Sequence, residues 1–407
     1  MPIPERSFAV LLYGRKIGLL QQRGAITRFS FGQDYLDDPR RPVLGLHFEE
    51  SPAEHRVKRL SLPPWFSNLL PEERLRRWIA AQRGVPLDRE VDLIAEVGHD
   101  LPGAVEVRAD DDLDRNPIWA DGDAADQFVA ASPRGGSRTR FRFSLAGVTM
   151  KFSMVRVGER LTLPGADERG DWIVKFPDAS FPGVPQNEYA MMSLAQECGL
   201  DVPEVSLRHR DELPELPDNL WPNGEEWAYP VRRFDRDEDR SPIHIEDLAQ
   251  VRGFYPERKY DSNFETVAAL VYRRHDVESL REFARRLAFN IIIGNSDAHL
   301  KNWSLIYRDR RRPTLSPAYD LVSTLPYGYH GLGMPWAGRT EAEHVTVSEF
   351  VALEQRLGVH AGLAEVVTET AHRLAGAWPV IEPMLAAVPD VRRPVAESVK
   401  VATRRLG

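Results

Sequence analysis

A short polar loop between two apolar segments, within residues 288–307, constrains this chain more than any other stretch. The sequence there is AFNIIIGNSDAHLKNWSLIY: Phe289–Ile293 and Trp303–Ile306 are mostly apolar, and the residues between them are mostly polar or chargeable. Two buried segments can hold a short connection rigidly while its polar side chains remain available for binding or chemistry. The pattern therefore predicts a fixed loop that concentrates functional groups at one place.

The spacing within this loop indicates a specific chemistry. Asp297 and Asn302 stand five positions apart, with His299 and Lys301 between them. In protein kinases an Asp followed five residues later by an Asn forms the catalytic loop, where the Asp accepts a hydroxyl proton and the Asn holds magnesium. Two other interpretations fit the stretch taken alone. It can be a structural loop, since Asp, His and Asn satisfy turn backbones, or a metal-dependent hydrolase site with Asp297 and His299 as ligands.

Length and composition narrow the class of protein. The chain has 407 residues, enough for two or three domains, and its 42% hydrophobic and 28% charged residues are typical of soluble globular proteins. The net charge of −8 argues against a general affinity for nucleic acid. A single cysteine, Cys198, excludes an internal disulfide and favours a reducing, cytoplasmic setting. No signal peptide is expected, and no run reaches the roughly 18 apolar residues of a membrane span.

A glycine turn between two strand-like segments is a candidate phosphate loop. Residues 140–145 and 150–157 are expected to be strands, and backbone N–H groups of a turn between them can point at anionic oxygens. An ordinary hairpin explains the same pattern. The candidate loop residues are Ser144, Ala146, Gly147 and Lys151. Lysine is rare in this chain, and an ammonium is not interchangeable with a guanidinium at a phosphate site, so Lys151, Lys175 and Lys301 support phosphate binding.

Lys175 and Glu188 form the next candidate pair. Lys175 lies in the apolar strand WIVKF, and Glu188 opens a helix thirteen positions later. A buried ammonium is costly unless an anion meets it, although Lys175 can also reach solvent along its own stem. Glu188 can equally be a helix-start carboxylate that the helix dipole favours. In kinases such a lysine and glutamate position the α and β phosphates.

Asp320 and the segment Tyr229–Arg236 complete the candidates. Asp320 stands eighteen positions after Asn302, behind a strand-like run, and would bring a second carboxylate back beside the loop. Mg²⁺ prefers one or two carboxylates plus phosphate and water oxygens. A lone Asp is also a common turn residue. Tyr229–Arg236 leaves a strand into a charged turn, where a hinge between two lobes would bind adenine through its backbone and pack it on Phe234.

The pattern of the whole chain predicts an α+β protein in four parts. These are a small α+β subdomain at 1–108, an acidic and glycine-rich linker at 109–139, a β-rich lobe at 140–236 and a mostly helical lobe at 237–407. Helices are expected at Ser67–Gln82, Glu90–Val97, Phe264–Tyr272, Ser279–Phe289, Val347–Leu357, Gly362–Ala377 and Asp390–Thr403. Another helix is expected to begin within Ser241–Gln250.

The candidate groups occur in the order in which kinases carry them, and the chain resembles the HipA-like serine/threonine kinase family, the toxin components of bacterial toxin–antitoxin pairs. The matching segments are SLAGVTMK (144–151), WIVKF (172–176), NEYAMMSLA (187–195), VRRFDR (231–236), IHIEDLAQ (243–250), GNSDAHLKN (294–302) and LSPAYDLVS (315–323). The resemblance covers essentially the whole chain, and DAHLKN and PAYD are its most specific motifs.

The resemblance implies an atypical two-lobed protein-kinase fold with ATP and Mg²⁺ as cofactors. Asp297 would be the catalytic base, Asn302 and Asp320 the magnesium ligands, and Lys175 the phosphate lysine. His299 and Lys301 match the family loop, where they support its shape and charge. The hinge would run from Arg232 through Arg233 to Phe234, and family members often carry an acidic residue where Arg232 stands.

The resemblance also implies regulation and partners. Ser144 matches the loop serine that family members autophosphorylate; a phosphate there adds about −1.5 to −2 charges and should drive the loop out, which turns the kinase off. Family toxins phosphorylate aminoacyl-tRNA synthetases, and a helix-turn-helix antitoxin of HipB type restrains them on operator DNA. The same motifs would serve a small-molecule phosphotransferase, and a non-catalytic repressor partner is a third interpretation. A metal hydrolase leaves Lys175 and the phosphate loop unexplained.

Overall fold

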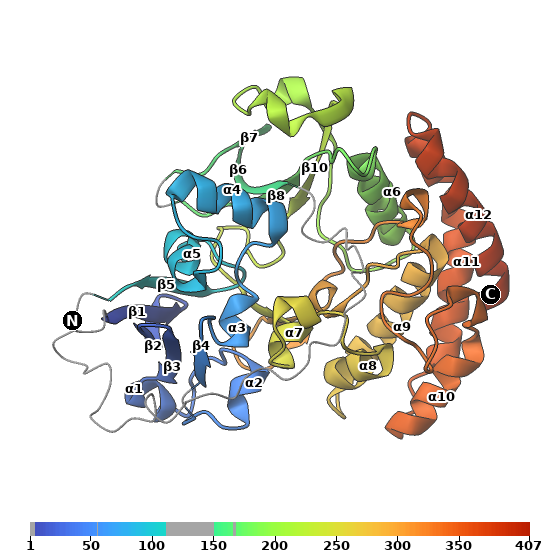
Figure 1. Cartoon of the computed structure of the whole chain (residues 1–407). Helices are drawn as coiled ribbons and strands as arrows, with labels where there is room; N and C mark the ends of the chain where they lie inside the picture. Colours follow the sequence, from blue (N-terminus) through green and yellow to red (C-terminus); the bar gives the residue numbers. More distant parts are fainter. Residues whose placement is uncertain (1–4, 55, 111–149, 166–167) are drawn as a thin grey trace. The chain divides into compact units, whose positions relative to one another are not determined.

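The computed structural model describes residues 5–54, 56–110, 150–165 and 168–407 (Figure 1). The chain divides into two compact units, Met1–Val148 and Thr149–Gly407. Most of the predicted linker and three residues of the predicted phosphate loop, Ser144, Ala146 and Gly147, lie outside the described residues.

An antiparallel sheet organises the first unit, with the strand order β4-β3-β2-β1-β5. Its strands are β1 (Glu5–Leu12), β2 (Arg15–Arg23), β3 (Ile26–Phe31), β4 (Arg56–Arg59) and β5 (Val105–Ala109). Its helices are α1 (Gln33–Leu36), α2 (Leu46–Glu49), α3 (Pro64–Ser67), α4 (Glu73–Arg83) and α5 (Glu90–Val97). Tyr13 and Gly14 both have positive φ, 53° and 75°, which is the backbone that a tight turn between β1 and β2 requires.

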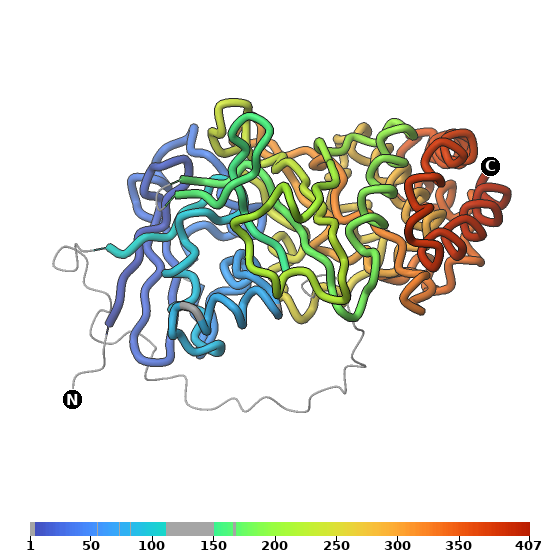
Figure 2. The backbone as a smooth tube through the Cα atoms, turned by 90° about the horizontal axis from the view of Figure 1, so that it is seen from above, coloured from blue at the N-terminus to red at the C-terminus, as the bar shows by residue number. Residues whose placement is uncertain are grey.

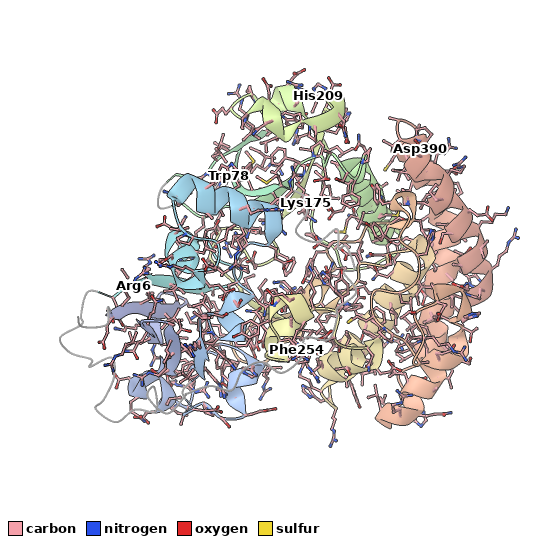
Figure 3. All side chains as sticks on the ribbon, in the orientation of Figure 1. Arg6, Trp78, Lys175, His209, Phe254 and Asp390 are labelled. Carbon is pink, nitrogen blue, oxygen red and sulfur yellow. The ribbon has the colours of Figure 1, made fainter. Side chains whose placement is uncertain are left out.

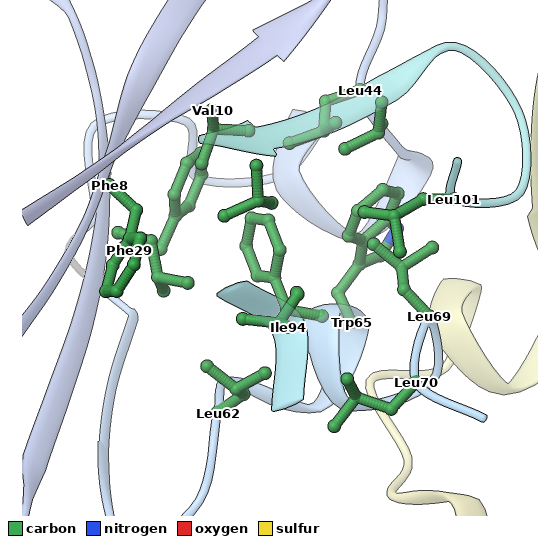
Figure 4. Packing of buried hydrophobic residues seen from close by; sticks show 14 of the residues in the cluster. Phe8, Val10, Phe29, Leu44, Leu62, Trp65, Leu69, Leu70, Ile94 and Leu101 are labelled. Atoms are coloured by element: carbon green, nitrogen blue, oxygen red, sulfur yellow. The ribbon is translucent and has the colours of Figure 1, made fainter. Parts of the chain in front are cut away.

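The core of this unit follows from alternation along the strands. Phe8, Val10 and Leu12 on β1 are buried because successive side chains of a strand point to opposite faces. They belong to one apolar cluster with Trp65 of α3 and Ile94 of α5 (Figure 4). Burying a large apolar side chain stabilises a fold by about 1.5–3 kcal/mol, so this cluster holds the helices against the sheet.

The single helix predicted at Ser67–Gln82 is wrong. The structure has α3 and α4 separated by a break that contains Pro71. Proline has no N–H to donate, and its ring disfavours a helical conformation in the preceding residue, Leu70. The end of α4 does follow its signal, since Gly84 adopts the left-handed conformation with φ +67°.

A second antiparallel sheet begins the second unit, with the order β7-β6-β8-β10-β9. Its strands are β6 (Lys151–Val157), β7 (Arg160–Thr162), β8 (Trp172–Lys175), β9 (Arg208–His209) and β10 (Trp227–Arg232). The register places Lys175 opposite Lys151 on one neighbouring strand and opposite Tyr229 on the other. Helix α6 (Val184–Glu197) follows β8 and carries Glu188 in its second turn.

The rest of the second unit is mostly helical. Its helices are α7 (Leu248–Val251), α8 (Phe264–Tyr272), α9 (Val277–Ile293), α10 (Val347–Leu357), α11 (Leu363–Ile381) and α12 (Pro389–Leu406). Helix α11 contacts α6, α9, α10 and α12, so the long helices form one packed group (Figures 1 and 2). Buried Leu280, Phe283 and Leu287 form the apolar side of α9, as their helical spacing predicts.

A small sheet, β11-β12-β13, carries the end of the predicted functional loop. Its strands are β11 (His244–Asp247), β12 (Ser304–Tyr307) and β13 (Thr314–Leu315). The helix expected to begin within Ser241–Gln250 is preceded there by a strand, since His244–Asp247 form β11 and pair with β12. The helix α7 starts only after Asp247, which caps it by accepting a hydrogen bond from Gln250 N–H at 2.8 Å.

Candidate active site

The predicted functional loop, residues 294–303, joins α9 to β12 and is called the α9–β12 loop. It contains a short 3₁₀ helix, Leu300–Asn302. Helix α9 ends at Gly294, whose φ of +68° a side chain would strain. Asp297, His299 and Asn302 are all buried, with 6%, 1% and 7% of their surface exposed. Because burying a polar group without partners is unfavourable, these residues need specific contacts.

Asp297 is held from two directions. Its backbone N–H donates to Asn295 Oδ1 at 3.0 Å, and Asn295 Nδ2 in turn donates to Asn290 Oδ1 at 2.8 Å in the last turn of α9. The hydroxyl of Tyr260 donates to Asp297 Oδ1. The main chain and the carboxylate of Asp297 are therefore fixed by different residues.

His299 and Lys301 are also tied to neighbouring segments. The His299 ring meets the Tyr260 ring edge-on, with 5.0 Å between the centroids. Lys301 Nζ lies 3.8 Å from Asp247 Oδ2, the carboxylate that caps α7. The carbonyl of Lys301 accepts a hydrogen bond from the Tyr319 hydroxyl at 2.7 Å, next to Asp320. The loop is thus anchored to the segment that carries the second predicted carboxylate.

Lys175, Glu188 and Asp320 meet as a triad. Lys175 Nζ lies 2.5 Å from Glu188 Oε1 and forms a second ion pair with Asp320 Oδ1. The strand β8, the helix α6 and the segment after β13 supply one member each. The triad is largely buried, with 13%, 8% and 30% of the three side chains exposed in the same order. Lys175 is labelled in Figure 3 on its strand.

Burial and the charges of the neighbouring side chains shift the pKa values of this triad in opposite directions. Burial alone would lower the pKa of Lys175, but Asp320 and Glu188 outweigh it and raise that pKa. Burial raises the pKa of Glu188 to about 7, against the opposing effect of Lys175. Burial also acts to raise the pKa of Asp320, yet Lys175 and then Lys151 lower it overall. Lys175 pairs with both carboxylates, and the more deeply buried Glu188 holds a proton more readily than Asp320.

Asn302 and Asp320 offer oxygen atoms of the kind that magnesium prefers. Within the described parts of the chain, Asn302 Oδ1 is buried and has no hydrogen-bond partner, a state that costs about 1–3 kcal/mol unless a ligand satisfies it. The described parts of the chain contain no cluster of three or more His, Cys, Asp or Glu side chains arranged for a metal ion. Magnesium would take one carboxylate oxygen and one amide oxygen from these two residues, with phosphate and water oxygens completing its shell.

The predicted hinge residues have separate environments. Arg233 donates to both oxygens of Asp235, from Nε at 2.9 Å and from Nη2 at 2.8 Å, in a buried pair. The Phe234 ring lies 5.3 Å from the Tyr319 ring at an angle of 35°. Arg232 is the last residue of β10, and its N–H donates to the Glu204 carbonyl at 2.8 Å. Phe234 is thus the hinge side chain that reaches the Asp320 segment.

Two residues that hold this site were missed in the sequence. Tyr260 lies in a turn just after the 3₁₀ helix Pro256–Arg258 and has no characteristic spacing to Asp297, so only the fold brings it to the carboxylate. Asn295 stands inside the polar loop, but its position does not reveal that it links Asp297, at 3.0 Å, to the Asp320 carbonyl, at 3.5 Å.

A strand lysine paired with a helix glutamate, beside a helical lobe with an Asp–Asn loop, defines the class of kinase-like α+β folds. Residues 143–378 match the HipA-like C-terminal domain, and residues 8–108 match the HipA N-terminal domain. The chain therefore belongs to the HipA-like kinase family, and the predicted family and fold class are confirmed.

Individual relatives agree with this assignment. The chain is 38% identical over 397 residues, 94% of each chain, to Y4dM of Sinorhizobium fredii, which is described as a candidate kinase. It is 27% identical over 288 residues to the serine/threonine-protein kinase toxin HipA of Shewanella oneidensis, covering 64% of this chain and 62% of that one. The structure of the Shewanella oneidensis MR-1 complex of HipA, HipB and operator DNA matches with a TM-score of 0.74 at 21% identity, covering 98% of this chain and 96% of that one. Within the described parts of the chain, no helix has the length and apolar character needed to cross a bilayer.

Proposed function

We propose that this protein is a serine/threonine protein kinase that uses ATP and Mg²⁺ and acts as the toxin of a bacterial toxin–antitoxin pair. The observation that carries the proposal is the link through Asn295, whose side chain contacts both the Asp297 N–H, at 3.0 Å, and the Asp320 carbonyl, at 3.5 Å. Asp320 in turn pairs with Lys175. Residues far apart in the chain thereby form one connected set of the types that phosphoryl transfer needs.

Each residue has a role that its chemistry supports. Asp297 accepts the proton of the substrate hydroxyl, which makes that oxygen a better nucleophile. Lys175 and Lys301 offset the negative charge of the phosphates, and Glu188 orients Lys175. Asn302 and Asp320 would hold Mg²⁺, which supplies further charge neutralisation when bound.

We also assign roles to the remaining candidate site residues and bounds to the domains of the chain. His299 supports the shape of the α9–β12 loop, and the hinge Arg232–Phe234 binds adenine through its backbone. The phosphate loop is Ser144–Lys151, with Ser144 as a self-phosphorylated switch. The parts are the subdomain 1–108, the linker 109–139, the β-rich kinase lobe 140–236 and the helical kinase lobe 237–407.

The partners in this proposal follow those of the relatives. The solved relative is a complex of HipA, HipB and operator DNA, and we assign a helix-turn-helix antitoxin of HipB type to this chain, with DNA reached only through it. The substrate is a cytoplasmic protein of the translation machinery, such as an aminoacyl-tRNA synthetase. No membrane partner is assigned.

Transfer of labelled phosphate from [γ-³²P]ATP tests the proposal directly. Purified full-length protein should label itself at Ser144 and label a protein in an extract of its host. Asp297→Asn should remove both signals by at least about 100-fold, the scale of a general base. The control is Asp390→Asn, the same change at an exposed position on α12 (Figure 3).

Three outcomes separate the proposal from its alternatives. Labelling that survives Asp297→Asn contradicts Asp297 as the base. ATP turnover that labels no protein indicates a small-molecule phosphotransferase. Protein that neither binds nor turns over ATP indicates a non-catalytic partner.

A further inference from the structure

Tyr260 contacts the α9–β12 loop from outside the motif that defines it. Its hydroxyl donates to Asp297 Oδ1, and its ring meets the His299 ring with 5.0 Å between centroids and an interplanar angle of 78°. The neighbouring main chain is attached to the same loop, since Leu300 N–H donates to the Lys259 carbonyl at 3.0 Å. One short segment therefore fixes the loop at three positions.

The contacts of Tyr260 use two different parts of its side chain, the ring and the hydroxyl group. The contact with His299, and that with Lys259 Nζ at 5.8 Å from the ring centroid, need only an aromatic ring. The hydrogen bond to Asp297 needs the hydroxyl, and a hydrogen bond to a carboxylate is charge-assisted. A phenylalanine at position 260 would keep the packing and lose this bond, so the two contributions can be separated by experiment.

The main chain and the carboxylate of Asp297 are held by different contacts. Asn295 Oδ1 accepts the Asp297 N–H at 3.0 Å, which holds the backbone. A general base must lie within hydrogen-bond reach of the proton that it removes, and a small misplacement lowers the rate steeply. The Tyr260 hydroxyl supplies an anchor at the carboxylate itself.

The geometry points to Tyr260 as a positioning residue that holds the Asp297 carboxylate in the orientation from which it takes the substrate proton. This inference rests on the proposed function, in which Asp297 is the base. In the transfer, the substrate hydroxyl oxygen bonds to the γ-phosphorus, and the bond from that phosphorus to the β–γ bridging oxygen breaks to release ADP. The hydroxyl proton goes to Asp297, and Tyr260 keeps its own proton throughout.

The test compares Tyr260→Phe with Tyr272→Phe in the full-length protein. Tyr272→Phe is the matched control because it removes the same hydroxyl from a largely buried tyrosine of α8, 8% exposed. Initial rates of phosphate transfer from [γ-³²P]ATP are measured over a range of ATP concentrations, together with the thermal unfolding midpoint. Tyr260→Phe should lower kcat by about 10-fold to 100-fold. Its KM for ATP should stay within about twofold of wild type, because the residue acts on the base and not on ATP binding.

Each result decides the inference. Equal kcat in the two variants overturns it, since the hydroxyl then contributes nothing at Asp297. A lower kcat that comes with a raised KM and a lowered unfolding midpoint also overturns it, because a general loosening of the site would explain the rate. A wild-type protein that transfers no phosphate refutes the proposed function, and this is known before any variant is compared.

Discussion

Replacing Lys175 by methionine removes the cation that pairs with both the buried Glu188 and the partly exposed Asp320. Lys175 Nζ lies 2.5 Å from Glu188 Oε1, where two unit charges attract by roughly 7 kcal/mol at an effective dielectric constant of about 20. Desolvation of the ions offsets several kcal/mol of this attraction. We therefore expect Lys175→Met to lower the free energy of unfolding by about 3–5 kcal/mol at pH 8, the range found when a buried ion pair loses one partner.

The loss should depend on pH with a definite sign. Burial raises the pKa of Glu188 to about 7, so its contribution to stability is full below its unfolded pKa near 4.5 and is lost as the pH rises through about 7. Without Lys175 the Glu188 carboxyl holds its proton still more tightly, and each further unit by which its pKa rises corresponds to about 1.4 kcal/mol. Lys175→Met should therefore cost about 1–3 kcal/mol more at pH 8 than at pH 5.5, where Glu188 is protonated in both proteins.

Urea unfolding of the full chain at the two pH values, followed by tryptophan fluorescence, measures this difference. Lys175→Met combined with Glu188→Gln should regain about 1–3 kcal/mol at pH 8, because it removes one of the two unpaired carboxylates. Lys400→Met, at a side chain that is 59% exposed, is the control and should change stability by less than about 0.5 kcal/mol. The same cost at both pH values, or no recovery in the double variant, would refute the electrostatic account of the triad.

Two further substitutions test the α9–β12 loop beside those at Asp297 and Tyr260. Asn302→Ala should raise the Mg²⁺ concentration for half-maximal phosphate transfer by about 10-fold or more. Thermal stability should not fall, because the change removes a buried acceptor that has no partner among the described residues. An unchanged Mg²⁺ dependence would contradict the role of Asn302 as a ligand. Gly294→Ala should lower the free energy of unfolding by more than about 1 kcal/mol, because an added Cβ would clash with the Leu325 side chain and φ is +68° there; an unchanged urea midpoint would contradict this.

Several helices could be predicted from the sequence. Glu90–Val97 is helical at the predicted residues, and Val347–Leu357 starts after the capping box at Thr346 and ends at Gly358, whose φ is +65°. Both predictions are confirmed, and the second helix carries its start and stop signals directly next to it. The stretch His244–Asp247 could not be predicted in this way, because its strand exists only through pairing with β12, far along the chain.

The candidate site shows the same division between local pattern and tertiary contact. Residue order and spacing predicted that Lys175 pairs with Glu188 and that Asp320 returns beside the loop; the structure shows the Lys175–Glu188 pair and places Asp320 at the same lysine. Spacing could not reveal that one lysine pairs with both carboxylates, or that Tyr260 and Asn295 hold Asp297. Such contacts depend on side-chain directions from separate elements, which no pattern within one element encodes.

The triad also supports an unfavourable backbone conformation at Asp320. Its φ of +54° is a left-handed conformation that costs a non-glycine residue about 1–2 kcal/mol and persists only where the surroundings hold it. The ion pair with Lys175 and the contact of its carbonyl with Asn295 Nδ2, at 3.5 Å, provide that support. On the proposed function, Lys175 would exchange Asp320 for a phosphate, and Asp320 would exchange Lys175 for Mg²⁺. Each side chain then keeps a partner of opposite charge, so the strained backbone would remain supported when phosphate and Mg²⁺ bind.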